Sequence, residues 1–283
     1  MTEKTRHVLG LSGGKDSSAL AVFVREHYPE LDVEYFFTDT GKELPEVYDY
    51  LNRLEAFLGK EIVRLNSDRD FDFWLKEYNH FLPSPRTRWC TRQMKIRPFE
   101  KWIEPTLAEG GKVISYVGIR SDEPYREGYV PTEGNVEVRL PFAENGIDKA
   151  GVMRILEDAG LGLPEYYKWR SRSGCTFCFY QQKIEWVRLM KEHPEAFEEA
   201  KQYEKTAKDN DSPFTWIEGM TLEEFEKPEK IKAVEEDYEK RKEAKRQKRR
   251  MNPLLEGEDV EVTDLDELYG EVEGRGACVM CHK

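Results

Sequence analysis

The sequence predicts an α/β protein with a doubly wound, mostly parallel sheet and a helical C-terminal part. In the first half of the chain, short apolar segments of strand length alternate with amphipathic segments of helix length. Small and charged residues directly follow three of the apolar segments. Because parallel strands end at one edge of a sheet and ligands bind beyond that edge, we expect these residues to form one site.

The elements follow in order along the chain. Strands are expected over residues 7–9, 33–38, 61–65 and 113–119, each a run of mainly apolar residues. The helices between them are expected over residues 17–27, 45–58 and 91–108, and Gly59 is expected to end the second of these. Beyond residue 141, helices are expected over 149–159, 181–191, 194–208 and 221–251. These elements divide the chain into an α/β domain over residues 1–145, a helical part over 146–251 and an acidic tail over 252–283.

A glycine-containing segment, Ser-Gly-Gly-Lys-Asp-Ser from Ser12 to Ser17, stands between the first strand and the first helix. In this position several backbone N–H groups and a helix N-terminus point at one place, which favours a phosphate or pyrophosphate. Gly13 and Gly14 let the backbone approach the anion, and Lys15 adds positive charge. The spacing differs from that of the P-loop of common nucleoside triphosphatases, in which Ser or Thr follows the lysine. The segment therefore predicts a phosphate-binding loop of another kind.

The composition predicts a soluble protein of the cytoplasm without a membrane segment. Charged residues make up 35% of the chain, and no apolar run approaches the ~20 residues that span a membrane. The first residues do not have the pattern of a signal peptide. The net charge of −12 argues against a direct nucleic-acid contact, although the tail 252–283 holds nine acidic and two basic residues and so carries much of this charge.

Five motifs occur along the chain in the order of a known superfamily. They are the Ser12–Ser17 loop, Phe37-Thr-Asp-Thr-Gly41, Cys90-Thr-x-x-Met-Lys-Ile-x-Pro98, Gly118-Ile-Arg-x-Asp-Glu123 and Gly174-Cys-x-x-Cys178. Together they resemble the phosphoadenylyl-sulfate reductase-like superfamily of N-type ATP pyrophosphatases, over about residues 8–191. The motif content is most similar to the ATP pyrophosphatase component of DNA phosphorothioation systems of Dnd or Ssp type. The resemblance implies an adenine nucleotide alpha hydrolase-like fold.

The resemblance also implies ATP and Mg²⁺ as ligands and assigns residues to them. Pyrophosphate would be bound by Ser12, Gly13, Gly14, Lys15 and Ser17, with Asp16 orienting the loop or a magnesium ion. Asp39 would touch the ribose or the metal, and Arg120 with Asp122 would close over the nucleotide next to Gly118. The expected catalytic residues are Lys15, Asp16, Ser17, Asp39, Arg120 and Asp122.

The activity that the resemblance implies is ATP-dependent activation of an acceptor for sulfur incorporation, by adenylylation with release of pyrophosphate. DNA backbone phosphorothioation is the leading case, with a sulfur donor such as a cysteine desulfurase and with DNA reached through a multiprotein complex. Two alternatives stay open: a sulfonucleotide (phosphoadenylyl-sulfate) reductase, and a non-catalytic ATP-binding subunit of a sulfur-modification or defence complex. The intact Ser12–Ser17 loop favours ATP activation, because the reductases of the superfamily have a degenerate loop.

All five cysteines are candidate metal ligands: Cys90, Cys175, Cys178, Cys278 and Cys281. In iron–sulfur members of the superfamily the ligands are a Cys-Cys pair, which matches Cys90 and Thr91 here, and a Cys-x-x-Cys pair, which matches Cys175 and Cys178. The resemblance therefore implies a 4Fe–4S cluster whose fourth ligand comes from Cys278 or Cys281 or whose iron stays open to sulfide or substrate. In the alternative, the two Cys-x-x-Cys pairs form a four-cysteine zinc site and Cys90 is a buried thiol. A tail cysteine could also carry a persulfide to the nucleotide.

Basic residues flank Cys90 at Arg86, Arg88, Arg92, Lys95 and Arg97. They could bind a triphosphate, a sulfur donor or a nucleic-acid backbone, or pair with the acidic surface of the protein itself. The contacts of each side chain in the fold distinguish these alternatives.

Overall fold

Five parallel strands form the centre of the protein. The computed structural model describes residues 5–126, 134–211 and 214–250. The strands are β1 Thr5–Leu11, β2 Val33–Asp39, β3 Ile62–Asn66, β4 Lys112–Tyr116 and β5 Val136–Arg139. They pair in the order β3-β2-β1-β4-β5, and every pair is parallel. The sheet confirms the expected α/β class.

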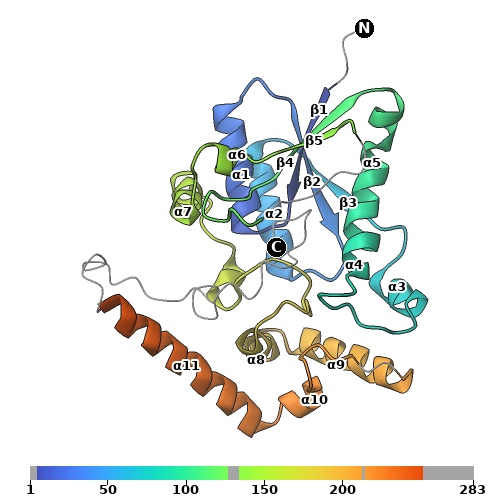
Figure 1. Ribbon diagram of the computed structural model, residues 1–283, viewed down its shortest axis with the longest axis vertical. Coiled ribbons are helices and arrows are strands. Elements are labelled where there is room, and N and C mark those ends of the chain that lie inside the picture. The colour runs from blue at the N-terminus through green and yellow to red at the C-terminus, as the bar shows by residue number, and fades with distance from the viewer. Residues whose placement is uncertain (1–4, 127–133, 212–213, 251–283) are drawn as a thin grey trace.

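Helices flank the sheet and then continue beyond it in the chain (Figure 1). They are α1 Lys15–His27, α2 Pro45–Leu58, α3 Phe71–Glu77, α4 Trp89–Thr91, α5 Arg97–Ala108, α6 Pro141–Glu144, α7 Lys149–Asp158, α8 Lys183–Glu192, α9 Pro194–Asp209, α10 Leu222–Phe225 and α11 Pro228–Arg250, with a π-helical turn η1 Arg92–Ile96 and a 3₁₀ turn η2 Glu165–Lys168. None of the described helices has the length and apolar character of a membrane span.

Helix bounds agree with the sequence where a strong local signal sets them. Helix α2 has the expected bounds and ends at Gly59, whose φ of 64° is the left-handed conformation of a C-cap. The expected helix 91–108 forms, with the π-helical turn η1 between α4 and α5. The expectation of one helix over 221–251 is wrong at its start, because Thr221 caps the short α10 and Pro228 then begins α11.

Alternating residues of the strands pack against different helices. Val8 of β1 and Phe36 of β2 lie in one cluster with Phe99 and Ile103 of α5. Leu9, the neighbour of Val8, belongs to the main core that includes residues of α1 and α2. Figure 1 shows α5 on one side of the sheet and α1 and α2 on the other. The two-residue period of strands that are buried on both faces produces this arrangement.

The strand order reverses between β1 and β4. From β1 the chain moves outward to β2 and β3, and it then adds β4 and β5 on the other side of β1. In open α/β sheets, ligands bind at such a reversal, beyond the carboxyl ends of the two strands. Residues 12–14 follow β1 and residues 117–123 follow β4, so both segments lie there. Helices α8 and α9 lie at the same end of the sheet (Figure 1).

Aromatic side chains pack the Cys175–Cys178 segment between the α/β part and the C-terminal helices. The buried ring of Phe177 lies 5.0 Å from that of Phe71 in α3 and 5.1 Å from that of Tyr203 in α9, measured between ring centroids. The rings of Phe71 and Tyr203 are themselves 5.2 Å apart. Close-packed aromatic contacts of this kind restrict movement, so the segment is held at one place relative to the sheet.

Candidate functional site

Two glycines shape the loop between β1 and α1. Gly13 has a φ of 70°, and a Cβ there would lie 2.7 Å from Cγ1 of Val47 in α2. Only glycine fits this conformation at so close an approach. A Cβ on Gly14 would lie 2.9 Å from Oγ of Ser173, so a segment from far along the chain closes tightly on the loop.

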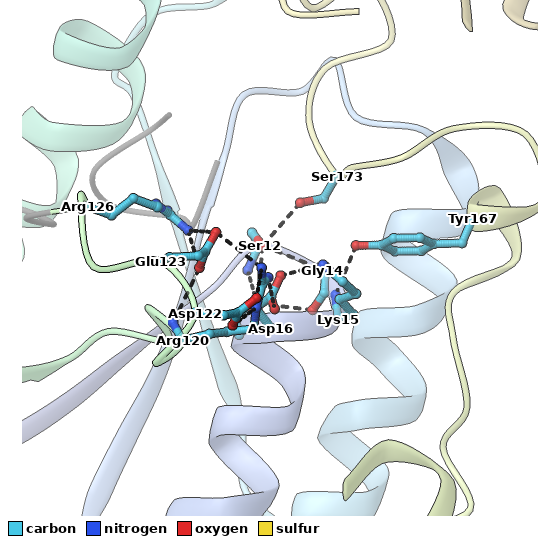
Figure 2. Close-up of polar contacts among 12 residues, drawn as sticks. Ser12, Gly14, Lys15, Asp16, Arg120, Asp122, Glu123, Arg126, Tyr167 and Ser173 are labelled. Carbon is cyan, nitrogen blue, oxygen red and sulfur yellow. Dashed lines mark hydrogen bonds and ion pairs between the residues drawn. The ribbon is translucent and has the colours of Figure 1, made fainter. Parts of the chain in front are cut away.

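Three backbone N–H groups of the loop donate to hydroxyl oxygens. The Ser12 N–H donates to Ser17 Oγ at 3.1 Å, and the Gly14 N–H donates to Ser12 Oγ at 3.2 Å. The Lys15 N–H donates to the Tyr167 hydroxyl at 3.3 Å. Figure 2 shows Ser12, Gly14, Lys15 and Tyr167 together at the start of α1. Since phosphate oxygens accept the same kind of hydrogen bond at a helix N-terminus, the loop can exchange these hydroxyls for an anion.

Lys15, Asp16 and Arg120 form a buried chain of ion pairs. Lys15 Nζ lies 2.7 Å from Asp16 Oδ2, and Arg120 Nη1 lies 3.0 Å from Asp16 Oδ1, with each side chain at most 8% exposed. Burial alone would raise the pKa of Asp16, but the charges of Lys15 and Arg120 hold that pKa well below its usual range. Burial opposes the charge of Lys15 too, yet Asp16 outweighs it and raises the Lys15 pKa. Both groups are therefore charged at neutral pH.

Arg120 extends the network into the segment after β4 (Figure 2). Its guanidinium donates to both carboxylate oxygens of Asp122, at 2.9 and 3.2 Å. Arg120 Nη2 also lies 3.5 Å from Glu123 Oε1, and Arg126 Nη1 lies 2.9 Å from both Glu123 oxygens. The Glu123 side chain is fully buried, whereas that of Asp122 is 41% exposed. Glu123 therefore anchors the two arginines, and Asp122 is the carboxylate that a ligand can reach.

The segments after β1 and β4 touch each other at Gly118. A Cβ on Gly118 would lie 3.1 Å from the carbonyl oxygen of Asp16, so glycine permits the contact. The two segments together bring nine of the expected residues into one place: Ser12, Gly13, Gly14, Lys15, Asp16, Ser17, Gly118, Arg120 and Asp122.

Asp39 ends β2, the strand beside β1. Its Oδ1 accepts hydrogen bonds from the Tyr48 hydroxyl at 2.7 Å and from the Gly41 N–H at 2.8 Å. Burial and the Asp39 carboxylate together raise the pKa of Tyr48, so its hydroxyl remains a donor. These bonds fix a half-buried carboxylate at the same edge of the sheet as the loop.

Three residues of the segment 166–173 contact the loop and were not expected from the sequence. The Tyr166 hydroxyl donates to the Gly13 carbonyl at 2.8 Å, and the Ser173 hydroxyl donates to Ser12 Oγ at 3.1 Å. The third is Tyr167, which accepts from the Lys15 N–H. Each contact joins residues more than 150 positions apart, so no local pattern in the sequence indicates it.

Cys175 lies against the segment that follows Asp39. Thr40 Oγ1 is 3.2 Å from Cys175 Sγ, and Glu43 Oε1 is 3.8 Å from the same sulfur. Burial and the Glu43 carboxylate raise the pKa of the Cys175 thiol well above its usual value. Lys95 Nζ lies 3.9 Å from Glu43 Oε1, while Glu43 Oε2 is buried without a hydrogen-bond partner. A protonated thiol therefore stands beside a buried carboxylate.

Two of the other four cysteines, Cys90 and Cys178, lie in the described residues. Cys90 lies in α4 and Cys178 follows Cys175 in a turn, and both are partly buried. In the described residues, no three His, Cys, Asp or Glu side chains are arranged to hold a metal ion. Cys278 and Cys281 lie outside the described residues.

The basic residues around Cys90 have separate partners. Arg92 pairs with Glu100 at 3.3 Å, which is the expected contact with the protein's own acidic surface. Lys95 approaches Glu43, and Arg88 packs with its guanidinium over the ring of Tyr180. Arg92, Lys95 and Arg88 thus contact three different parts of the protein.

Residues 6–134 match the model of the phosphoadenosine phosphosulfate reductase domain. An uncharacterised protein of Methanocaldococcus jannaschii is 27% identical to the chain, with 68% of this chain and 40% of that protein covered. An uncharacterised nin region protein of Escherichia phage lambda is 25% identical, with 42% of this chain and 50% of that protein covered. The chain thus spans half or less of the length of these two relatives.

Solved structures also match. The phosphoadenylyl-sulfate reductase of Candida auris, in a phosphate complex, has a TM-score of 0.46 and 14% identity, with 60% of this chain and 81% of that chain covered. The U34-tRNA thiolase of Methanococcus maripaludis with its 4Fe–4S cluster has a TM-score of 0.38 and 18% identity, with 72% of each chain covered.

Proposed function

We propose that this chain, whose residues 6–134 match the phosphoadenosine phosphosulfate reductase domain, uses ATP to activate an acceptor oxygen for sulfur incorporation. The observation that carries the proposal is the loop 12–17, whose N–H donors converge beside the buried Lys15–Asp16–Arg120 network. Fixed donors and a buried cation suit a leaving pyrophosphate, because they stabilise charge that develops during the reaction.

The proposed reaction joins the acceptor to the α-phosphorus of ATP. An acceptor oxygen attacks that phosphorus with its electron pair, and the bond to the oxygen that bridges the α and β phosphates breaks. Pyrophosphate leaves with the electrons of that bond, and Lys15 with the loop N–H groups stabilises its charge. A sulfur nucleophile then displaces AMP from the activated acceptor. Asp16 keeps Lys15 charged and oriented throughout.

Mg²⁺ would neutralise part of the phosphate charge. Asp39 fits as its carboxylate ligand, because Tyr48 and Gly41 fix it at the edge of the site. Asp16 fits less well, since Lys15 and Arg120 each take one of its two oxygens. We therefore assign Asp16 to orienting the loop.

For the acceptor we propose a DNA backbone phosphate, with a cysteine desulfurase as the sulfur donor. The net charge of −12 supports contact with DNA through partner proteins more than through this chain alone. A phosphoadenylyl-sulfate reductase is the second candidate, and the family match favours it. The complete Ser-Gly-Gly-Lys-Asp-Ser loop favours ATP activation instead.

We further propose a 4Fe–4S cluster ligated by Cys90, Cys175, Cys178 and one tail cysteine, with a zinc site as the alternative. Cys175 and Cys178 lie in one turn, where the Cys178 N–H donates to the Cys175 carbonyl at 3.1 Å, and Cys90 and Cys175 pack against the same hydrophobic core. Thiolate sulfur is the ligand that both kinds of centre use. Burial and the Glu43 carboxylate both raise the pKa of the Cys175 thiol, so they disfavour the thiolate there until a cation binds.

Pyrophosphate release from ATP and Mg²⁺ under anaerobic conditions tests the proposed activity. Ser17→Ala removes a hydroxyl that we assign to the leaving pyrophosphate as a hydrogen-bond donor, and we expect at least about a tenfold slower release. Ser67→Ala is the matched control, because Ser67 bonds the Trp74 indole away from the loop. Equal rates in Ser17→Ala and Ser67→Ala would contradict the assignment of the loop.

A further inference from the structure

Two arginines from distant parts of the chain lie within cation–π distance of one tyrosine ring. Cζ of Arg88, the residue before α4, lies 5.7 Å from the centroid of the Tyr180 ring. Cζ of Arg172 lies 5.9 Å from the same centroid. Both distances allow a cation–π contact, so each of the two guanidinium groups lies close to the Tyr180 ring.

Part of the Arg88 guanidinium lacks hydrogen-bond partners in the protein around it. Its Nε and Nη2 atoms are buried and have no hydrogen-bond partner among the residues that the structure describes. Buried charged donors without a partner are costly, and a bound anion is the partner that removes this cost. A guanidinium offers a fork of N–H groups that matches two oxygens of a tetrahedral oxyanion.

The surroundings of Tyr180 are electropositive and contain thiols. The pKa of Tyr180 is raised by burial, lowered by the charges of Arg88 and Arg172, and raised by the thiols of Cys178 and Cys90. A tyrosine hydroxyl is protonated at neutral pH, so the Tyr180 hydroxyl is a hydrogen-bond donor. Two guanidinium groups and one hydroxyl donor therefore share this place.

The place is joined to the candidate nucleotide loop through the backbone. Arg172 directly precedes Ser173, whose hydroxyl donates to Ser12 Oγ at 3.1 Å. Glu185 fixes this stretch, because its Oε1 accepts from both the N–H and the hydroxyl of Ser171, at 2.7 and 2.9 Å. The position of Arg172 relative to the loop is thus set by buried hydrogen bonds.

We propose that Arg88, Arg172 and the Tyr180 hydroxyl bind a small tetrahedral oxyanion of the sulfate or thiosulfate class beside Cys90 and Cys178. A small ion fits better than a polymer backbone, since Arg172 is only 8% exposed and the two unpaired nitrogens of Arg88 are buried. The binding of this ion requires no nucleotide and does not depend on the proposed function.

Calorimetric titration of the full chain with sodium thiosulfate and with sodium sulfate, without nucleotide and at constant ionic strength, tests the site. We expect millimolar or tighter binding, weakened at least tenfold in Arg88→Gln and less in Arg88→Lys, which keeps the charge but loses the fork. Arg69→Gln is the matched control, because Arg69 stacks 4.9 Å over Phe73 on the surface. Circular dichroism establishes that each variant is folded, and thermal stabilisation by sulfate gives a second readout that a merely structural role of Arg88 would not change.

The possible results distinguish a separate oxyanion site from a site for the phosphates of ATP or of DNA. Thiosulfate binding that persists with saturating pyrophosphate and depends on Arg88 supports a separate site. Absence of binding to the wild-type chain, equal weakening by Arg69→Gln, or full competition by pyrophosphate would overturn it, the last because the phosphates of ATP would then be the ligand. Arg88-dependent binding of a short DNA duplex without oxyanion binding would also overturn it. Oxyanion binding without pyrophosphate release would leave the site standing and remove the proposed function.

Discussion

Replacing Asp16 by Asn tests whether the buried ion-pair chain depends on its central carboxylate. Asn keeps the shape of the side chain but removes the charge that Lys15 and Arg120 share, at 2.7 and 3.0 Å. Each pair is worth about 6 kcal/mol at an effective dielectric constant of ~20, before the cost of burial is subtracted. Removing one partner of a buried pair typically costs about 3–5 kcal/mol, because the remaining charge stays uncompensated.

We therefore expect Asp16→Asn to lower the free energy of unfolding by about 3 kcal/mol or more, and the melting temperature by about 5 °C. Asp122→Asn is the matched control, since Asp122 binds the same Arg120 at 2.9 Å but is 41% exposed. Its loss should stay below about 1 kcal/mol. Urea unfolding followed by circular dichroism measures both variants. Equal losses in the two, or a loss below about 1 kcal/mol for Asp16→Asn, would refute this account of the network.

The remaining predictions concern pH, the loop and the cysteines. Asp16 and Asp122 have pKa values below their ordinary 3.8, so the folded state binds fewer protons than the unfolded state. The stability that these two carboxylates supply is therefore present above pH ~4 and is lost as the pH falls below it. In urea unfolding between pH 5 and 3, the free energy of unfolding should decrease less for Asp16→Asn than for the wild type. Tyr167→Phe frees the Lys15 N–H, so calorimetry should show pyrophosphate binding several-fold tighter than in wild type, and unchanged or weaker binding would contradict the exchange of hydroxyl for anion. Anaerobically purified protein should be brown with absorbance near ~400 nm, and Cys175→Ser or Cys178→Ser should abolish the colour, whereas colourless protein with about one zinc per chain would favour the zinc site. Truncation after Gly274, and Cys278→Ser or Cys281→Ser singly, should lower the iron content; full iron in all three would leave the sulfur-carrier role for the tail.

The local sequence predicts the elements better than it predicts their contacts. Helix α2 is bounded by Pro45 and Gly59, two residues with strong positional preferences, and its bounds are as expected. The strand expected over 113–119 ends at Tyr116, and Gly118 beyond it lies against the backbone of Asp16 in α1. Helix α3 was not expected, although Asp70 caps it through the Phe73 N–H, a signal that was readable. The edge strand β5 has only four residues and was also not expected.

The residues of the candidate site also fall into those that the sequence predicts and those that it does not. The loop 12–17 and the segment with Arg120 and Asp122 were predictable, because both follow strands and parallel strands end at one edge. The contacts of Tyr166, Tyr167 and Ser173 with the loop were not, since they depend on how the chain returns after more than 150 residues.

The central claim is that ATP is cleaved between its α and β phosphates. The most direct measurement incubates the anaerobic protein and Mg²⁺ with ATP labelled on either the α or the γ phosphate, and separates the products. We predict that the α label appears in AMP or an adenylylated acceptor and the γ label in pyrophosphate, with both products reduced in Ser17→Ala. Recovery of the α label in ADP and of the γ label in orthophosphate would contradict the claim.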